Sequence, residues 1–486
     1  MKSFFVFSFF FSSVLLFSQE PTDTISLTLN DCIRMGQQNG PLAAMARNAY
    51  SGDKHRYQSY TARYLPQLSL TGDAPQFIRT INSITQPDGS SSFLLQRQAQ
   101  SSLSLALSQQ VPWTGTEISI YSGLNRLDNL ETKASFYRST PLSLSLRQPL
   151  FSINTIAWNY ELEDLNYQSS HREFVEAMEE AAIDITNKFF AYYLAIMNVN
   201  NAQLNLSIND TLFLVSKGRF NVGKIAENDL LQSELAALNA RTQYENAIIE
   251  YDRALQNFRF SIGLNNTEPI RVVPDESIYS LNIDPGVALD FARQNRSDMV
   301  NYEVQKLNAD RSVRQAESNN SFSMSISANI GLNQKANTFD AAYANLLDQQ
   351  QFSVQFQVPL VGWGTGSHAV EAALAERSRV ETNVESQRFT LEQDVKYQVQ
   401  RFKQLQQQVM LSAKADTVAQ RRFDVTRERF VIGKIDVTNL FLAQSEKDNA
   451  YRTRIQTLWD YWTTYYRLRR LTLYDFALQR PLLVKE

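Results

Sequence analysis

The 486-residue chain contains only one cysteine and three histidines. Structural zinc sites, dithiol redox motifs and disulfide frameworks need several such residues, so the sequence has almost nothing from which to build one. The formal net charge is −3, which does not indicate the basic surface typical of nucleic-acid-binding proteins. His55, His171 and His368 are far apart and form no catalytic pattern. We therefore expect no enzymatic activity, no cofactor, no metal ion and no nucleic-acid partner.

Long hydrophobic runs are absent except at the N-terminus, which reads MKSFFVFSFFFSSVLLFSQ. Lys2 precedes an apolar run of 14 residues, Phe4 to Phe17, whereas a membrane-spanning helix needs about 20. Residues 1–18 are therefore predicted to be a secretory signal peptide. Cys32 lies well beyond this run and is expected to be a small core residue of the first helix. No later segment has the length of a spanning helix, so a mature protein inserted in a membrane would use other structure.

Glycine and proline are missing from two stretches of 66 residues, 152–217 and 367–432. Each predicts one helix of about 100 Å, at 1.5 Å per residue. Apolar residues recur in both at spacings of three and four, which is typical of a coiled-coil-like seam. Further helices are predicted over residues 227–262 and 437–478, each returning antiparallel after a glycine. The seam residues are Phe174, Met178, Ala181, Ile185, Tyr192, Ile196 and Val199, then Val380, Val384, Leu391, Val395, Phe402, Leu405 and Val409.

The segment GRFNVGKIAENDL, which begins at Gly218, contains G-x-x-x-x-G-K. A phosphate-binding loop continues with Ser or Thr, but Ile225 stands there, and a long predicted helix precedes the motif instead of a strand. The segment ERFVIGKIDVTNL repeats R-F-x-x-G-K-I 210 positions later (433 − 223), with Glu428 at the position of Gly218. What the two segments share predicts a turn between two helices, not a phosphate site.

This repeat extends through most of the chain. QPLF near Pro149 matches VPLV near Pro359 at the same offset, whereas PQLSLTG matches SFSMSIS at an offset of 256 (324 − 68). The difference, 256 − 210, places about 46 additional residues in the first copy. We therefore expect a signal peptide over residues 1–18, a first repeat over 19–264, a linker over 265–286 and a second repeat over 287–486.

Several short segments alternate apolar and polar residues, as β-strands with two different faces do. NSFSMSISANIG and FSVQFQVP show this in the second copy, and SLSLALSQQVPW and LSLSLRQP show it in the first. The polar face is rich in Ser, Gln and Arg, which suits a water-filled lumen, while export and strand length suit an outer-membrane barrel. The additional residues contain VPWTGTEISIYSG and predict an extra hairpin. Trp113 and Trp363 stand at strand ends, where interfacial aromatics are useful.

The chain resembles the outer-membrane efflux protein family, the TolC-like channels. The resemblance rests on the order and duplication of LTLNDCIRMGQQNGPL, RYLPQLSLTG, RQPLF, RFNVGKI, ERFVIGKIDVTNLFLAQSE and LRRLTLYDF. It implies an α+β membrane protein in a Gram-negative bacterium, with long antiparallel helices forming a periplasmic tunnel. Strands from a homotrimer would close one barrel in outer-membrane lipid, usually with four strands from each protomer. The implied function is a passive exit duct for a tripartite efflux or type I secretion system, which includes a periplasmic adaptor and an inner-membrane pump.

The resemblance also implies roles for particular residues at the helix turns. The two turns would dock the adaptor through Arg219, Gly223 and Lys224 and through Arg429, Gly433 and Lys434. Asp229 matches an acidic residue that lines the closed tunnel end, where three copies would form a ring favouring cations. The second repeat has Asn439 at the corresponding position and Leu442 at the next acidic position, so the ring has fewer carboxylates.

Two other function classes are weighed against this one. An exported coiled-coil structural or adaptor protein would also have a signal peptide and long helices, although adaptors are expected to carry a lipoyl-like β-domain that is not visible here. A P-loop enzyme is the third class, and it conflicts with the missing hydroxyl and the helix before the motif. The transported substrate and the identities of the adaptor and the pump stay open.

Overall fold

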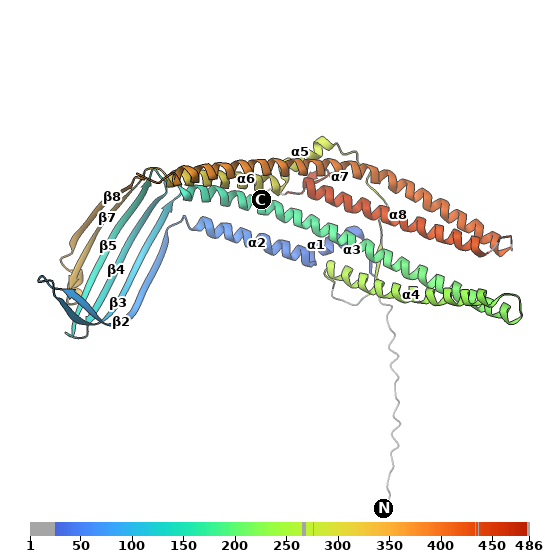
Figure 1. The fold of residues 1–486 in the computed structure, drawn as a ribbon, viewed down its shortest axis with the longest axis horizontal. Helices are drawn as coiled ribbons and strands as arrows, with labels where there is room; N and C mark the ends of the chain where they lie inside the picture. Colours follow the sequence, from blue (N-terminus) through green and yellow to red (C-terminus); the bar gives the residue numbers. More distant parts are fainter. Residues whose placement is uncertain (1–24, 265–268, 276, 433, 436, 484–486) are drawn as a thin grey trace, which may run out of the picture.

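The computed structural model describes residues 25–264, 269–275, 277–432, 434–435 and 437–483. The molecule is elongated, with one six-stranded sheet at one end and helices that run from it toward the opposite end (Figure 1). The predicted signal peptide and Gly433 lie outside the described residues, as do residues 265–268 of the predicted linker. Within the described ranges, no helix combines the length and the apolar character needed to cross a membrane.

Two helices of 67 residues, α3 (Thr155–Asn221) and α7 (Thr365–Val431), give the molecule its length. They confirm the two long helices predicted from the sequence, and each is about 100 Å long at 1.5 Å per residue. The antiparallel helices α4 (Glu227–Ser261) and α8 (Val437–Thr472) follow them. Most of the predicted seam is buried, including Ile185 of α3 and Val395 of α7.

Shorter helices precede the strands in each half of the chain. They are α1 (Leu29–Asn39) and α2 (Pro41–Ala62), then α5 (Pro285–Asn295) and α6 (Ser297–Asn319). Side chains fix two of the helix starts. The Thr28 hydroxyl accepts a hydrogen bond from the Asp31 amide, and Asp284 accepts from the amides of Gly286 and Val287. These bonds satisfy amides that have no partner inside the helix.

The sheet has the order β2-β3-β4-β5-β7-β8, and every neighbouring pair is antiparallel. The extra hairpin predicted in the first half therefore joins the same sheet as the other strands. Each predicted strand segment overlaps a strand of this sheet, and most strands are longer than the predicted segments. Phe322 and Val358 are exceptions, because β7 begins after Phe322 and β8 ends before Val358. The strands are β2 (Gln67–Thr85), β3 (Ser91–Val111), β4 (Thr116–Asn129), β5 (Ala134–Leu150), β7 (Ser323–Ala336) and β8 (Leu347–Gln357).

The largest core lies along the helices, away from the sheet. Tyr461 and Trp462 of α8 are buried there, and Trp459 of the same helix stacks on Phe190 of α3 with ring centroids 6.3 Å apart. The buried Cys32 of α1 belongs to the same cluster, as expected for a small core residue. Beside this core, β1 (Ile25–Thr28) pairs in parallel with β6 (Ile270–Val273), which lies within the predicted linker.

The end of α8 corrects one prediction, because the helix stops at Thr472 and not near Leu478. Leu473 has φ +47°, outside the right-handed helical region, so the chain turns there. The buried carboxylate of Asp475 then accepts hydrogen bonds from the amides of Ala477 and Leu478, both at 3.0 Å. These local bonds replace the helical ones. The short strands β9 (Tyr474–Asp475) and β10 (Arg480–Pro481) pair after the turn, and the 3-10 helix η1 (Asp340–Tyr343) lies between β7 and β8.

Candidate functional site

One face of the sheet is apolar from strand to strand. Residues opposite one another in paired strands share a face, so the strand register defines continuous rows. One such row crosses five strands through Leu68, Leu107, Ile120, Leu144 and Ile330. Most of these side chains are exposed in the single chain. An exposed apolar face of this extent is suited to contact with lipid.

The opposite face is polar across all six strands. A row of small hydroxyl and amide side chains runs along it, with Arg147 and Glu117 opposite one another in the next row. A depression of about 280 Å³ lies on this face, lined by Arg147, Glu117 and residues of the polar row. The face is therefore suited to water. The members of the polar row are Gln67, Ser108, Ser119, Ser145, Asn329 and Gln351.

Exposed aromatic residues mark the boundary between the sheet and the helices. Trp113 follows β3 and is 81% exposed, and Trp363 follows β8 and is 94% exposed. The rings of Phe151 and Phe322 lie at the same boundary with centroids 5.5 Å apart. Aromatic girdles of this kind occur where membrane strands reach the edge of the hydrocarbon layer. The boundary is therefore suited to the edge of an apolar layer.

The first helix turn has the geometry of a glycine-terminated helix. Gly223 has φ +70°, its amide donates to the Phe220 carbonyl at 2.8 Å, and the Lys224 amide donates to the Arg219 carbonyl at 2.9 Å. Together these two bonds form a Schellman motif, which ends α3. The G-x-x-x-x-G-K segment is thus the last turn of a helix and not a loop after a strand, which contradicts a phosphate-binding role. Arg219 and Lys224 are exposed beside the turn.

The second turn repeats one of these bonds. The Lys434 amide donates to the Arg429 carbonyl at 2.9 Å, as the Lys224 amide does to that of Arg219. Gly433 lies outside the described residues. Arg429 and Lys434 are exposed. The ends of the two helix pairs lie apart in Figure 1 at the far end of the molecule from the sheet.

The predicted constriction residues lie just beyond these turns. Asp229 is exposed in the first turn of α4, where a negative side chain is favourable beside the helix N-terminus. Asn439 is exposed near the start of α8, and Leu442 follows it by one turn. Asp229 and Asn439 therefore occupy equivalent places on two separate helix pairs. The single chain shows where they lie but does not bring them together.

The sequence model of the outer membrane efflux protein family matches residues 86–264 and 288–472, which is most of the chain. The chain belongs to the outer membrane efflux protein family. This membership confirms the resemblance noted from the sequence, and the family is one of outer membrane efflux proteins. It gives no support to the alternative of an exported coiled-coil structural or adaptor protein.

Individual relatives of this efflux protein are distant. An uncharacterized protein of Haemophilus influenzae is 25% identical over 116 residues, covering 22% of this chain and 26% of its own length. The toxin and drug export protein A of Aggregatibacter actinomycetemcomitans is 24% identical over 116 residues, covering 22% and 25%. The chain thus matches about a quarter of the length of these curated relatives.

Solved structures share the fold over nearly the whole chain. The Campylobacter jejuni CmeC outer membrane channel has a TM-score of 0.64 at 14% identity, covering 91% of this chain and 85% of its own. The open Neisseria gonorrhoeae MtrE outer membrane channel has a TM-score of 0.61 at 13% identity, covering 94% and 91%. The Vibrio cholerae outer membrane protein VceC has a TM-score of 0.59 at 13% identity, covering 91% and 95%. These similarities show a TolC-like channel fold.

A buried charge cluster joins α3, α8 and the turn after α8, and no role was predicted for its residues from the sequence. Arg469 of α8 pairs with Glu179 of α3 at 2.8 Å and with Asp475 at 3.3 Å, and Asp475 accepts from the Tyr465 hydroxyl at 2.9 Å. Burial raises the pKa of Glu179 to about 7, although Arg469 acts in the opposite direction. Arg469 follows Trp462 and Tyr465 at helical spacing on the buried stripe of α8. That spacing was the signal available in the sequence.

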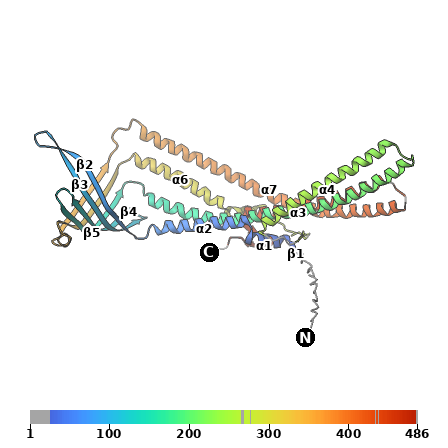
Figure 2. The same cartoon turned by 90° about the horizontal axis from the view of Figure 1, so that it is seen from below.

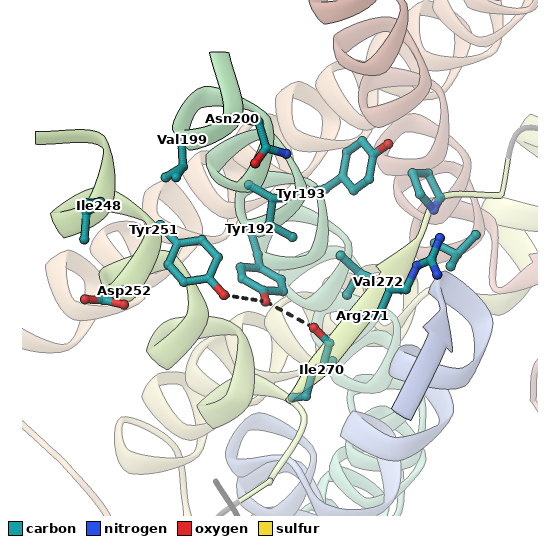
Figure 3. Close-up of a pocket in the computed structure, with 13 residues that line it drawn as sticks. Tyr192, Tyr193, Val199, Asn200, Ile248, Tyr251, Asp252, Ile270, Arg271 and Val272 are labelled. Carbon is teal, nitrogen blue, oxygen red and sulfur yellow. Dashed lines mark hydrogen bonds between the residues drawn. The ribbon is translucent and has the colours of Figure 1, made fainter. Parts of the chain in front are cut away.

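A pocket of about 660 Å³ lies between α3, α4 and β6 (Figure 3). Tyr192 of α3 donates to the Ile270 carbonyl of β6 at 3.3 Å, and its hydroxyl lies 3.5 Å from that of Tyr251 in α4. Burial raises the pKa of Tyr192, so its hydroxyl keeps the proton that it donates. Asp252 and Arg271 supply the charge in the lining, from different elements. Tyr192 thus joins α3 to β6 and to α4, and we interpret the pocket as part of the packing around this strand.

Proposed function

We propose that the chain is the outer-membrane exit duct of a tripartite efflux or type I secretion system. Three copies close one barrel, and their helices form a tunnel that extends into the periplasm. Substrates delivered by an inner-membrane pump and a periplasmic adaptor pass through it to the exterior by diffusion. The duct binds no cofactor and catalyses no reaction.

The proposal rests on one observation: the same chain contains an amphipathic sheet and two 67-residue helices that extend from it. Figure 2 shows the sheet at one end and the helix pairs extending from it. A sheet with one apolar and one polar face separates lipid from water. Helices of about 100 Å extend far beyond a hydrocarbon layer of about 30 Å, so they continue the water-filled path outside the membrane.

The helix ends support the adaptor-docking role of Arg219, Gly223, Lys224, Arg429, Gly433 and Lys434. The Schellman bonds at Gly223 keep the first turn compact, and a Cβ built on Gly223 would meet no described atom beyond its two chain neighbours within 4 Å. The glycine is therefore needed for its positive φ, and the space around it is open to a partner. Arg219 and Lys224 add exposed positive charge beside that space.

Asp229 and Asn439, which follow the two helix turns, would act as constriction residues only in the assembled trimer. Three copies of Asp229 and Asn439 around one axis would line the periplasmic end of the tunnel with alternating carboxylate and amide groups. The similar order of elements before and after residues 265–286 supports the duplicated plan of two repeats. Export through the predicted signal peptide would deliver the chain to the periplasmic side of the outer membrane.

The docking role is tested by Gly223→Asn, because asparagine tolerates positive φ while adding a side chain at the turn. Export is measured in a deletion strain complemented by each variant, using whichever dye, detergent or metal ion the deletion makes toxic. We expect export to fall about tenfold or more, the change produced by a loss of about 1.4 kcal/mol in docking free energy. Trimers in the membrane should remain at the normal level.

Gly218→Ala is the matched control. A Cβ built on Gly218 also meets no described atom within 4 Å beyond its neighbours in the helix, but Gly218 lies inside α3 and the second repeat has Glu428 in its place. Alanine favours the helix, so export should be unchanged. Normal export by Gly223→Asn would contradict adaptor docking at this turn.

A further inference from the structure

The two outer edges of the six-stranded sheet have no strand partner among the residues that the structure describes. β2 forms one edge and β8 the other, while β3, β4, β5 and β7 each have two neighbours. Backbone groups at an open edge cannot be satisfied in hydrocarbon, so a membrane sheet must close on itself or on other copies. The two edges therefore need partners wherever the apolar face contacts lipid.

We propose that the trimer closes an eighteen-strand barrel, with β8 of each protomer paired antiparallel to β2 of the next. The count is three protomers with six strands each, and it rests on the proposed trimeric exit duct. It differs from the family pattern of four strands per protomer, which gives twelve. The extra hairpin is then part of the pore wall and not an external loop.

The two edges match in direction and in pattern. All neighbours in the sheet are antiparallel, so β2 and β8 run in opposite directions, and placing β8 beside the next β2 continues the alternation. On β2, Leu68 and Leu70 are exposed on the apolar face, and on β8, Phe352 and Phe356 are exposed on the same face. A junction between these edges would extend both the apolar and the polar face.

The extra hairpin is hydrogen-bonded to the start of the helical part through the turn between β3 and β4. The Asn154 side chain donates to the Pro112 carbonyl at 2.7 Å, and Gln148 donates to the Thr114 carbonyl at 3.0 Å. Asn154 also caps α3 by accepting from the Ala157 amide at 3.2 Å. The turn between β3 and β4 thus sits against the first turn of a tunnel helix, which is where the base of a barrel wall would lie.

β2 is long enough to allow the shift in strand register that barrel closure requires. Strands in a barrel are tilted and shifted in register from one to the next. β2 has 19 residues and β8 has 11, and β4 joins β3 only from Gln98 downward. The part of β2 toward Thr85 therefore continues the free edge beyond the level at which β4 ends, at Asn129. A shifted β8 of the next protomer would have a continuous strand to pair with.

The strand number changes the width of the pore. Strands about 4.8 Å apart and tilted about 40° give a barrel about 36 Å across for eighteen strands and about 24 Å for twelve. Barrels with 16 to 18 strands contain a water-filled channel. The barrel would then not limit substrate size, and the helix ends that carry Asp229 and Asn439 would form the narrow part of the duct.

Disulfide cross-linking in membranes tests the closure. Phe352→Cys on β8 is combined with Leu68→Cys, Leu70→Cys or Phe77→Cys on β2, and in a second series with Ile118→Cys, Ile120→Cys or Leu124→Cys on β4. The native Cys32 is fully buried, so it does not compete. Leu68→Cys with Leu107→Cys, which lie opposite one another on β2 and β3, shows that oxidation works within one chain.

We expect at least one β2 pair to give covalent dimers and trimers, and no β4 pair to do so. Cross-links from β4 without any from β2 would overturn the proposal, because they mean a twelve-strand barrel with β2 and β3 outside it. Trimers, detected separately by native mass spectrometry, with no cross-link in either series would also overturn it. A protein that forms no trimer would instead contradict the proposed duct itself.

Discussion

Arg469 and Arg470 are adjacent at the end of α8, yet their ion pairs lie in opposite environments. The Arg469 and Glu179 side chains are only 18% and 5% exposed. Those of Arg470 and Glu180 are 37% and 51% exposed. Breaking a buried pair leaves an uncompensated charge, whereas an exposed pair contributes little to stability. We therefore expect the two arginines to contribute differently to stability, because Arg469 lies on the buried side of α8 and Arg470 on the exposed side.

Arg469→Met is expected to destabilise the protein by about 3–5 kcal/mol, because Glu179 and Asp475 lose their shared cation. Arg470→Met should change the stability by at most about 1 kcal/mol. Denaturant unfolding of the detergent-purified protein at pH 8 measures both, since Glu179 is ionised above its pKa of about 7. Equal losses for the two variants would contradict the structural role given to the buried cluster.

Single residues could be predicted from the sequence where the local chain determines their role. Gly223 was identified as a turn residue because the repeated R-F-x-x-G-K-I ends two long stretches without glycine, and its φ of +70° explains the choice. The role of Arg469 depends on Glu179, which is 290 positions away. A contact between such distant positions leaves no local pattern, although helical spacing places Arg469 on the buried stripe.

The strands show how much of an element its own sequence determines. Alternation predicted which side chains share a face, and the register confirms this for Met324, Ile326 and Ala328 of β7. The alternation could not give the partner of each strand. β5 and β7 pair although helices α3 to α6 separate them in the chain. The end of α8 was misplaced because Leu473 and Asp475 form a turn that periodicity does not predict.

Adjacent residues of β5 provide a test of the two faces. Leu144→Arg places a charge on the face assigned to lipid and should cost about 2–4 kcal/mol near the middle of the membrane. We expect this variant to be lost from the outer-membrane fraction. Ser145→Arg lies on the polar row and should insert normally, with three added charges shifting the pore toward anions in planar-bilayer recordings. Normal insertion of both variants, or loss of both, would contradict the assignment of the faces.

At the scale of the whole molecule, the sequence predicts long helices and amphipathic strands in one chain, and the structure contains both. The duplication of this plan stays a prediction. The sequence also predicts an extra hairpin, but only the structure places it in the same sheet as the other strands. In the part of the chain that the structure describes, the sheet has two unpaired edges and the helix pairs end apart. The proposed trimer would supply the missing partners, so its closure depends on contacts between copies.

The most direct measurement of the central claim is a cryo-electron microscopy structure of the protein purified from membranes into lipid nanodiscs. The account predicts three copies around one axis, with the sheets closed inside the disc and α3, α4, α7 and α8 extending beyond it as a hollow tunnel. The apolar row through Leu144 should face lipid and the polar row through Ser145 should face the lumen. A monomeric particle, or a trimer whose sheets lie outside the disc, would contradict the account.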